Sequence, residues 1–311
     1  MPTRVKTLRL FDYFFFLRPT LFIPVWTIFL IGHYYSGERF CWHSLLSMII
    51  FTFMMGGVYI LNQIIDRESD RINNKVFFLA QNIIPLKASY IYMFSLLITT
   101  LAIAPFFGPS YFFVFLSALI LGILYSLPPI NLKARPFLDM FANGIGYGVF
   151  SFVLGWTTTR EPNGFMWIRS IPYFLTVSAV FVNTTIPDIR GDSATNKITT
   201  GVFMGKKNVM LLGLILDLIS LFTAVILKDW ICTIGAAISL PFFILPLFKP
   251  GKKEILLSIR VSASILSLII IFVYPEFGLL LLILYFSMKF YYKKRFNINY
   301  PSFTSGVEND F

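Results

Sequence analysis

About ten stretches of this chain are apolar over the length that a helix needs to cross a lipid bilayer. A helix rises about 1.5 Å per residue, so roughly 20 residues cross a hydrocarbon core of about 30 Å. Pro, Gly, Asn and charged residues separate the runs. The runs lie at about 20–36, 43–62, 88–106, 110–126, 139–157, 170–187, 209–227, 229–248, 255–274 and 277–292. The last two, separated only by Pro275 and Glu276, also fit one long, broken helix.

The composition of the 311 residues agrees with this pattern. Hydrophobic residues make up 57% of the chain and charged residues only 13%, whereas soluble domains have about 45–50% and about 25%. A water-soluble enzyme or a disordered chain does not fit these fractions. The sequence therefore predicts an all-α, polytopic transmembrane bundle of nine to ten spans, with the lipid bilayer as its surroundings.

The 26 Lys and Arg residues are unevenly distributed between the loops. Most fall on the side that holds the N-terminus and the loops after the second and sixth runs, and the positive-inside rule places that side in the cytoplasm. Because this bias accounts for most of the net charge of +11, no nucleic-acid partner is expected. Residues 1–18 are basic and aromatic, as in an interfacial segment. Asp229 and Lys228, on the other side, are interpreted as surface charge.

Two acidic motifs follow predicted cytoplasmic ends of spans. Asn62, Asp66 and Asp70 are spaced four apart, which places them on one face of a helix. Asp188 and Asp192 repeat the spacing. Carboxylates this close repel one another when ionised, and a bound cation relieves the repulsion. Mg²⁺ prefers oxygen ligands and typically binds through one or two carboxylates plus substrate phosphates. We therefore predict that the four Asp residues are catalytic and, with Asn62, hold Mg²⁺ against a diphosphate.

Basic residues beside the two motifs complete the predicted site. Tyr125 and a Pro pair precede Lys133 and Arg135, which return to the membrane surface on the motif side. They would clamp a phosphate-bearing headgroup, or they are only anchors that orient the helices. The acids could likewise be solvated loop residues paired with nearby arginines. The other basic candidates for substrate binding are Arg71, Arg190 and Lys197.

In this order and spacing, the motifs resemble those of the UbiA-type family of intramembrane prenyltransferases. The acidic motifs match the family's N-x-x-x-D-x-x-x-D and D-x-x-x-D signatures, and residues 125–133 match its Tyr-Ser-x-Pro-Pro-x-x-x-Lys connection. The resemblance implies one domain over residues 1–311, usually with nine spans around a central cavity. It also implies that Mg²⁺ binds a polyprenyl diphosphate through the two Asp motifs. We predict that Asn143 points into the cavity and binds substrate.

The resemblance implies Mg²⁺-dependent transfer of a polyprenyl group to an acceptor in the membrane. An aromatic precursor in quinone biosynthesis is the leading acceptor; a lipid, a carotenoid and a glycerol phosphate remain alternatives. Aromatic faces could stabilise the allylic cation, but the sequence does not choose among the candidates Phe14, Phe15, Tyr59, Phe141 and Tyr147. The competing class is a transporter or channel without catalysis. It would be favoured by Asp217, the one acid deep in a span.

The chain departs from the family pattern at two places. Gln63 stands where an Asp often follows the first Asn. Residues 77–85 lack the Arg-Pro-x-x-x-Gly stretch that is common after the first motif. One expected phosphate contact is thereby missing, and Lys75 or Lys87 would take its place.

Overall fold

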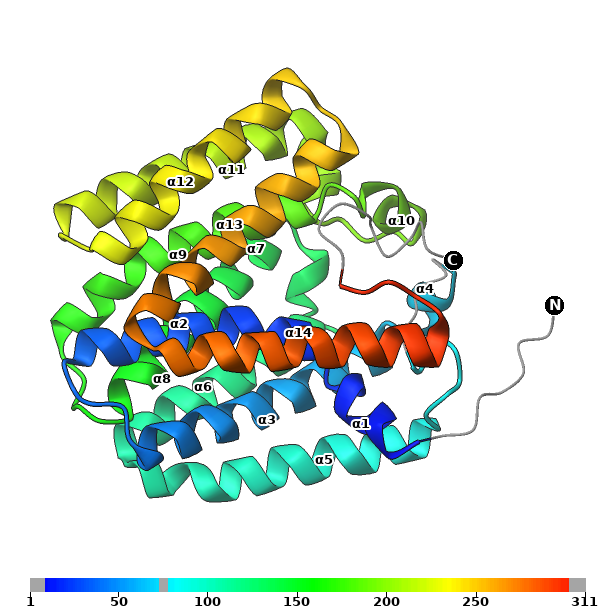
Figure 1. The fold of residues 1–311 in the computed structure, drawn as a ribbon. Coiled ribbons are helices and arrows are strands. Elements are labelled where there is room, and N and C mark those ends of the chain that lie inside the picture. Colours follow the sequence, from blue (N-terminus) through cyan, green and yellow to red (C-terminus); the bar gives the residue numbers. More distant parts are fainter. Residues whose placement is uncertain (1–8, 73–77, 302–311) are drawn as a thin grey trace.

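The computed structural model describes residues 9–72 and 78–301, and all regular elements in these residues are helical (Figure 1). Nine helical stretches in this part of the chain are long and apolar enough to cross a membrane. They are Leu10–Ser36, Trp42–Ile65, Leu86–Phe107, Pro109–Ser126, Leu138–Thr157, Gly164–Thr184, Thr200–Ile226, Trp230–Phe248 and Lys252–Val273. The predicted all-α membrane bundle is confirmed.

 The helical elements within these nine stretches are α1 (Leu10–Phe16), η1 (Pro19–Leu21), α2 (Phe22–Ser36), α3 (Trp42–Ile65), α5 (Leu86–Ile103), η2 (Ala104–Phe107), α6 (Pro109–Ser126), α7 (Leu138–Asn143), the π-helical segment η4 (Gly144–Phe150), α8 (Ser151–Thr157), α9 (Gly164–Thr184), α11 (Thr200–Ile226), α12 (Trp230–Phe248) and α13 (Lys252–Val273). Short helices lie in the loops between them: α4 (Arg67–Ile72), η3 (Leu132–Ala134) and α10 (Ile189–Ala194).

The predicted span at 277–292 is a separate helix, α14 (Pro275–Phe296). Pro275, at its first position, has no N–H to donate and starts the new helix after α13. Glu276 at the start and the basic residues of the last turn shorten the apolar part, so α14 is not among the nine stretches. It lies along the bundle beside α13, with Phe277, Leu284 and Met288 buried against the main core.

The seventh span begins earlier than predicted, at Thr200 instead of about residue 209. The side chain of Thr199 caps it by accepting a hydrogen bond from the Val202 N–H, at 3.4 Å. Lys206 and Lys207 interrupt the apolar pattern, and for this reason the sequence does not predict the first part of α11. The backbone of Gly205 is non-helical there, with φ 75°, a conformation that glycine adopts without steric cost.

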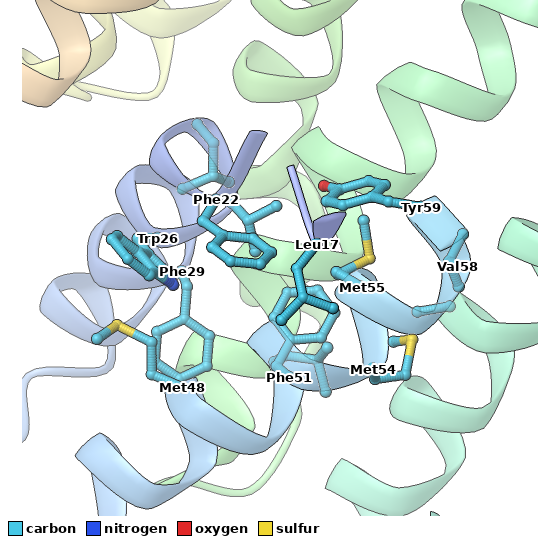
Figure 2. Packing of buried hydrophobic residues seen from close by; sticks show 14 of the residues in the cluster. Leu17, Phe22, Trp26, Phe29, Met48, Phe51, Met54, Met55, Val58 and Tyr59 are labelled. Atoms are coloured by element: carbon cyan, nitrogen blue, oxygen red, sulfur yellow. The ribbon is translucent and has the colours of Figure 1, made fainter. Parts of the chain in front are cut away.

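The main core forms where α2, α3 and α8 pack together. Figure 2 shows large side chains from α2 and the turn before it beside those of α3, among them Phe22, Trp26 and Phe29 with Met48 and Phe51. Gly32 and Gly155 allow close backbone contact between α2 and α8. A Cβ at either position would lie 1.9 Å from a backbone oxygen of the other helix. Small residues of this kind allow membrane helices to approach closely.

A smaller core cluster joins α9, α11, α12 and α13. It includes Val182, Val209 and Phe243, all buried. The loops that carry α4 and α10 lie at the same end of the bundle (Figure 1). The fold thus brings the two acidic motifs to one end of the molecule.

Candidate active site

The first motif spans the junction between α3 and α4. Asn62 lies in the last turn of α3, and Asp66 follows the end of that helix and donates its N–H to the Asn62 carbonyl at 2.9 Å. The N–H of Asp70 then donates to the Asp66 carbonyl at 2.8 Å. Because these are successive i, i+4 hydrogen bonds, the three side chains keep the helical spacing across the junction. Asp70 is buried, and Asn62 and Asp66 are half-buried.

Two lysines from distant loops meet at the carboxylate of Asp66. Lys133, in η3, donates to Oδ2 at 2.7 Å, and Lys197, between α10 and α11, donates to Oδ1 at 3.1 Å. These contacts join segments that are 67 and 131 residues apart in the chain. The loop after the second motif therefore reaches the first motif, and the Tyr125–Lys133 connection reaches it as well.

The electrostatics of this group follow from burial and from the two ammonium groups. Burial by itself raises the pKa of Asp66, but Lys133 and Lys197 together outweigh burial and hold that pKa below its usual value. Burial lowers the pKa of Lys133, and the nearby Asp66 carboxylate offsets part of this effect. Asp66 is thus held as an anion beside two cations, a charge arrangement that an incoming phosphate group can join.

The second motif lies on α10. Asp188 precedes the helix, and the Asp192 N–H donates to its carbonyl at 2.9 Å, so the predicted i, i+4 spacing is present. Oδ2 of Asp192 accepts from the Thr199 hydroxyl at 3.3 Å, and the Lys197 N–H donates to the Asp192 carbonyl at 2.9 Å. The Asp192 loop therefore holds the backbone of Lys197, whose side chain binds Asp66.

The residues predicted as metal ligands share one end of the bundle, but they do not form one compact cluster. Within residues 9–72 and 78–301, no group of three or more His, Cys, Asp or Glu side chains is placed to hold a metal ion. One link between the two loops is the Lys197–Asp66 ion pair. The donors present are carboxylate and amide oxygens, which suit Mg²⁺. The carboxylate of Asp66, moreover, already pairs with the two cationic groups of Lys133 and Lys197. The residues therefore fit a divalent cation, and the metal site stays a prediction.

A cavity of about 500 Å³ lies inside the bundle, next to the first motif. Helices α2, α3, α6, α7, α9 and α13 and the segment η4 contribute its mostly apolar lining. Asn62, Tyr125 and Asn143 all line it, so these three predicted substrate-binding residues are brought together. Asn62 Nδ2 donates to the Ser126 hydroxyl at 3.2 Å, which orients its amide.

Two phenol groups face each other across the cavity wall. The Tyr147 hydroxyl, in η4, donates to the Tyr59 hydroxyl of α3 at 2.8 Å. Both side chains line the cavity, whereas Phe14, Phe15 and Phe141 do not. Of the five aromatic candidates, Tyr59 and Tyr147 are thus the two that the structure places at this cavity. A π-helical segment such as η4 often occurs at functional sites.

Other predicted residues lie apart from this group. The Arg135 guanidinium is exposed and donates to the Pro129 carbonyl at 3.0 Å. Arg71, Arg190 and Lys87 are exposed, and Lys75 lies outside the described residues. Gln63 is buried, and its amide donates to the carbonyls of Phe16 and Tyr59 at 3.0 and 3.2 Å. Gln63 thereby connects α3 to α1.

Arg18 and Asp139 are not among the site residues that the sequence predicts. Arg18 lines the cavity from a left-handed backbone conformation, with φ 57°. Asp139 is buried at the start of α7, where its carboxylate accepts from the Thr200 N–H at 2.8 Å and from the Thr200 hydroxyl. This contact fixes the beginning of α11 against α7. The only signal in the sequence was the position of Asp139 shortly after Lys133 and Arg135.

Two further acids lie away from the cavity. Asp217 is fully buried in α11 and does not line the cavity, and in the described part of the chain neither of its carboxylate oxygens has a hydrogen-bond partner. The interpretation of Asp229 as surface charge is wrong, because this residue is 0% exposed. Its Oδ1 accepts from the hydroxyls of Tyr35 and Tyr173 and from the Cys232 N–H, at 2.5, 2.9 and 3.0 Å.

Comparisons with known proteins identify relatives of this architecture. The sequence profile of the UbiA prenyltransferase family matches residues 21–254. The lycopene elongase/hydratase of Corynebacterium glutamicum is 23% identical over 226 residues, which cover 71% of this chain and 79% of that protein. The digeranylgeranylglyceryl phosphate synthase of Methanosphaera stadtmanae is 28% identical over 209 residues, or 66% and 73% of the two chains. Among solved structures, a UbiA homologue from Archaeoglobus fulgidus bound to GPP and Mg²⁺ superposes with a TM-score of 0.67 at 19% identity, over 82% of this chain and 96% of that one.

Proposed function

The chain belongs to the UbiA prenyltransferase family, and from this premise we propose that it transfers a polyprenyl group from a polyprenyl diphosphate to an aromatic acceptor in the membrane, with Mg²⁺. The observation that carries the proposal is the meeting of Lys133 and Lys197 at Asp66. Asp66 lies one helical turn beyond Asn62, which lines a mostly apolar cavity. A charged group at the edge of an apolar cavity matches a donor with a diphosphate head and a hydrocarbon tail.

The residues around Asp66 would bind the diphosphate head. Asn62, Asp66, Asp70, Asp188 and Asp192 are the proposed ligands of Mg²⁺, which when bound supplies positive charge that stabilises the leaving diphosphate. Lys133 and Lys197 donate hydrogen bonds to phosphate oxygens as the negative charge on the leaving group grows. The exposed cations Arg71, Arg135 and Arg190 would bind the same group from the rim.

The cavity residues would act on the prenyl group and on the acceptor. Tyr59 and Tyr147 place aromatic faces in the wall of the cavity, where they stabilise an allylic cation. The apolar lining keeps water from that cation. Tyr125 and Asn143 add polar atoms at the same cavity, which suits a flat aromatic ring that carries hydroxyl groups. This is the basis for proposing an aromatic acceptor.

The reaction is tested with purified protein, Mg²⁺, labelled prenyl diphosphates of several lengths and a panel of acceptors. The panel contains hydroxylated benzoates and quinols, lycopene and a glycerol phosphate, because the relatives named above include proteins for carotenoid and glycerol-phosphate lipids. We expect a prenylated aromatic product, identified by mass, that EDTA abolishes and Mg²⁺ restores. A product with only lycopene or glycerol phosphate would replace the proposed acceptor, and transfer that survives EDTA would contradict the proposed metal dependence.

We also propose that the end of the bundle with both Asp motifs faces the cytoplasm, on the basis of the positive-inside rule. Two native thiols allow a sharp test, since Cys41 is exposed in the loop between α2 and α3 and Cys232 is buried. A membrane-impermeant maleimide is expected to label Cys41 in intact cells. In a Cys41→Ser background, Gln81→Cys should react only after the cells are made permeable. Labelling of Gln81→Cys in intact cells would reverse the orientation.

A further inference from the structure

A second hollow, of about 370 Å³, lies between α1 and α14, outside the central cavity. Residues of both helices line it, including Arg9, Phe11 and Phe14 on one side and Phe290 and Lys294 on the other. Both α1 and α14 fall entirely outside residues 21–254, which the family profile matches. This groove is therefore built from elements beyond the matched region of the chain.

The floor of the groove is fixed by a buried ion pair. Asp12 of α1 is 0% exposed and accepts from Arg295 Nη2 of α14 at 2.8 Å and from the Tyr291 hydroxyl. Phe15 stacks on Tyr291, with ring centroids 3.7 Å apart. These contacts hold α1 against α14 and neutralise the acid beneath the groove. A groove with such a floor is preformed and needs little ordering when it binds a ligand.

The rim of the groove combines cations with exposed aromatic rings. Arg9 and Lys294 are both exposed, and the Lys294 ammonium lies over the Phe290 ring, 5.3 Å from its centroid. Phe11 and Phe290 are 69% and 67% exposed. No acidic residue is among the described residues that line the groove. The rim therefore offers positive charge beside uncovered apolar surface, at the end of the bundle where α4 and α10 also lie (Figure 1).

We propose that this groove binds one anionic phospholipid. Arg9 and Lys294 bind the phosphate of the headgroup, and Phe11, Phe14 and Phe290 contact the beginning of the acyl chains. A soluble anion would use only the cations, and a neutral lipid would use only the rings. A phospholipid with net negative charge is the ligand that matches both. The lipid would bridge α1 and α14 and would stabilise the contact between the two ends of the chain. The proposal does not depend on the acceptor or on the reaction.

The test uses purified full-length protein in detergent, to which phosphatidylglycerol or phosphatidylcholine with the same acyl chains is added. Native mass spectrometry counts retained lipids, and tryptophan fluorescence follows thermal unfolding. We expect one tightly retained phosphatidylglycerol and a rise in Tm that phosphatidylcholine does not produce. Arg9→Gln with Lys294→Gln should weaken phosphatidylglycerol binding by about 30-fold, at about fivefold for each basic residue near a membrane surface.

The matched control is Lys289→Gln with Lys293→Gln, which removes the same charge from α14 at exposed positions outside the groove lining. It should bind phosphatidylglycerol like the wild type. The single variants Arg9→Gln and Lys294→Gln, each about fivefold weaker, keep the test valid if the double variant does not fold. The proposal is overturned if the control loses as much affinity as the groove variant or if phosphatidylcholine binds equally well. The same holds if inorganic phosphate alone reproduces the rise in Tm.

Discussion

Asp66 and Asp229 lie at opposite ends of the bundle, each beside the end of a membrane-spanning helix, and differ in their partners. Asp66 is paired with two ammonium groups, and its side chain keeps 15% of its surface exposed. Asp229 is fully buried and accepts from two phenols and a backbone N–H. Burial raises the pKa of Asp229, whereas the two lysines keep that of Asp66 low against the effect of burial.

The difference separates a site that can exchange partners from one that cannot. Lysine side chains are long and flexible, and an ammonium group can move from a carboxylate to a phosphate while it keeps its charge balance. The hydroxyls of Tyr35 and Tyr173 belong to rings packed in helices α2 and α9, and both donate to the same oxygen of Asp229. The contacts of Asp229 therefore stabilise the fold, and those of Asp66 leave room for a ligand.

The largest expected effect is on turnover at the motif end. Asp66→Asn keeps the shape of the side chain and removes its charge, so we expect kcat to fall by about 10²–10³, while Tm falls by only about 1–3 °C. Asp188→Asn should lower kcat by a similar factor. The double variant should lower kcat by less than the product of the two single effects, because the groups act as one unit. Single-turnover rates with labelled donor measure this. A double variant with near-normal turnover would show that the site lies elsewhere.

The next effect is on stability at the other end. Asp229→Ala leaves two phenols and a backbone N–H without their acceptor in a buried place, which costs about 2–4 kcal/mol. We expect Tm to fall by roughly 5 °C or more, while kcat per folded molecule stays near that of the wild type. Thermal unfolding and an activity assay at low temperature give the two values. If activity is lost and Tm is unchanged, Asp229 is not the structural residue that its contacts indicate.

Lys133 and Arg135 should differ, although the sequence grouped them. Lys133 is buried beside Asp66, and Arg135 is exposed and bound to a carbonyl of its own loop. We expect Lys133→Gln to raise the KM for the prenyl donor by about tenfold, as for the loss of one charge-assisted hydrogen bond. Arg135→Gln should raise it by less than about threefold. The KM for the acceptor should change little in both. Equal effects on the donor KM would mean that both cations act only through the general charge of the loop.

The sequence predicted much of this architecture because membrane helices leave a direct signal. Apolar length gave the spans, and the spacing of Asn62, Asp66 and Asp70 gave the helical face that the hydrogen bonds display. The start of α11 was missed, because Lys206 and Lys207 at the membrane surface resemble the end of a loop. The run at 277–292 was predicted as a possible tenth span, and the structure shows it as the separate helix α14, which packs beside α13 and is not among the nine stretches.

The contacts of individual polar residues were beyond the sequence, since they join segments far apart in the chain. Nothing in the spacing indicated that Lys197 would reach Asp66, or that Tyr35, Tyr173 and Asp229 would share hydrogen bonds. Asp229 follows Lys228 at a short helix junction, a context in which most acids are solvated. Only the packing of α2 and α9 around the junction shows that it is buried.

The smallest expected effect is a pH dependence of opposite sign at the two carboxylates. Since the folded-state pKa of Asp66 is lowered, its contribution to stability is present above its unfolded pKa of about 4 and is lost as pH falls through the lower folded value. Since the folded-state pKa of Asp229 is raised, its contribution to stability is full below about pH 4 and is lost as pH rises through the higher folded value.

In metal-free buffer, the difference in Tm between the wild type and Asp66→Asn should therefore shrink as pH falls from 6 to 3. Over the same range the difference between the wild type and Asp229→Asn should move in favour of the wild type, by roughly 1–3 °C. Thermal unfolding of the three proteins at several pH values measures both trends, and two trends of the same sign would refute the assignment of different partners to the two acids.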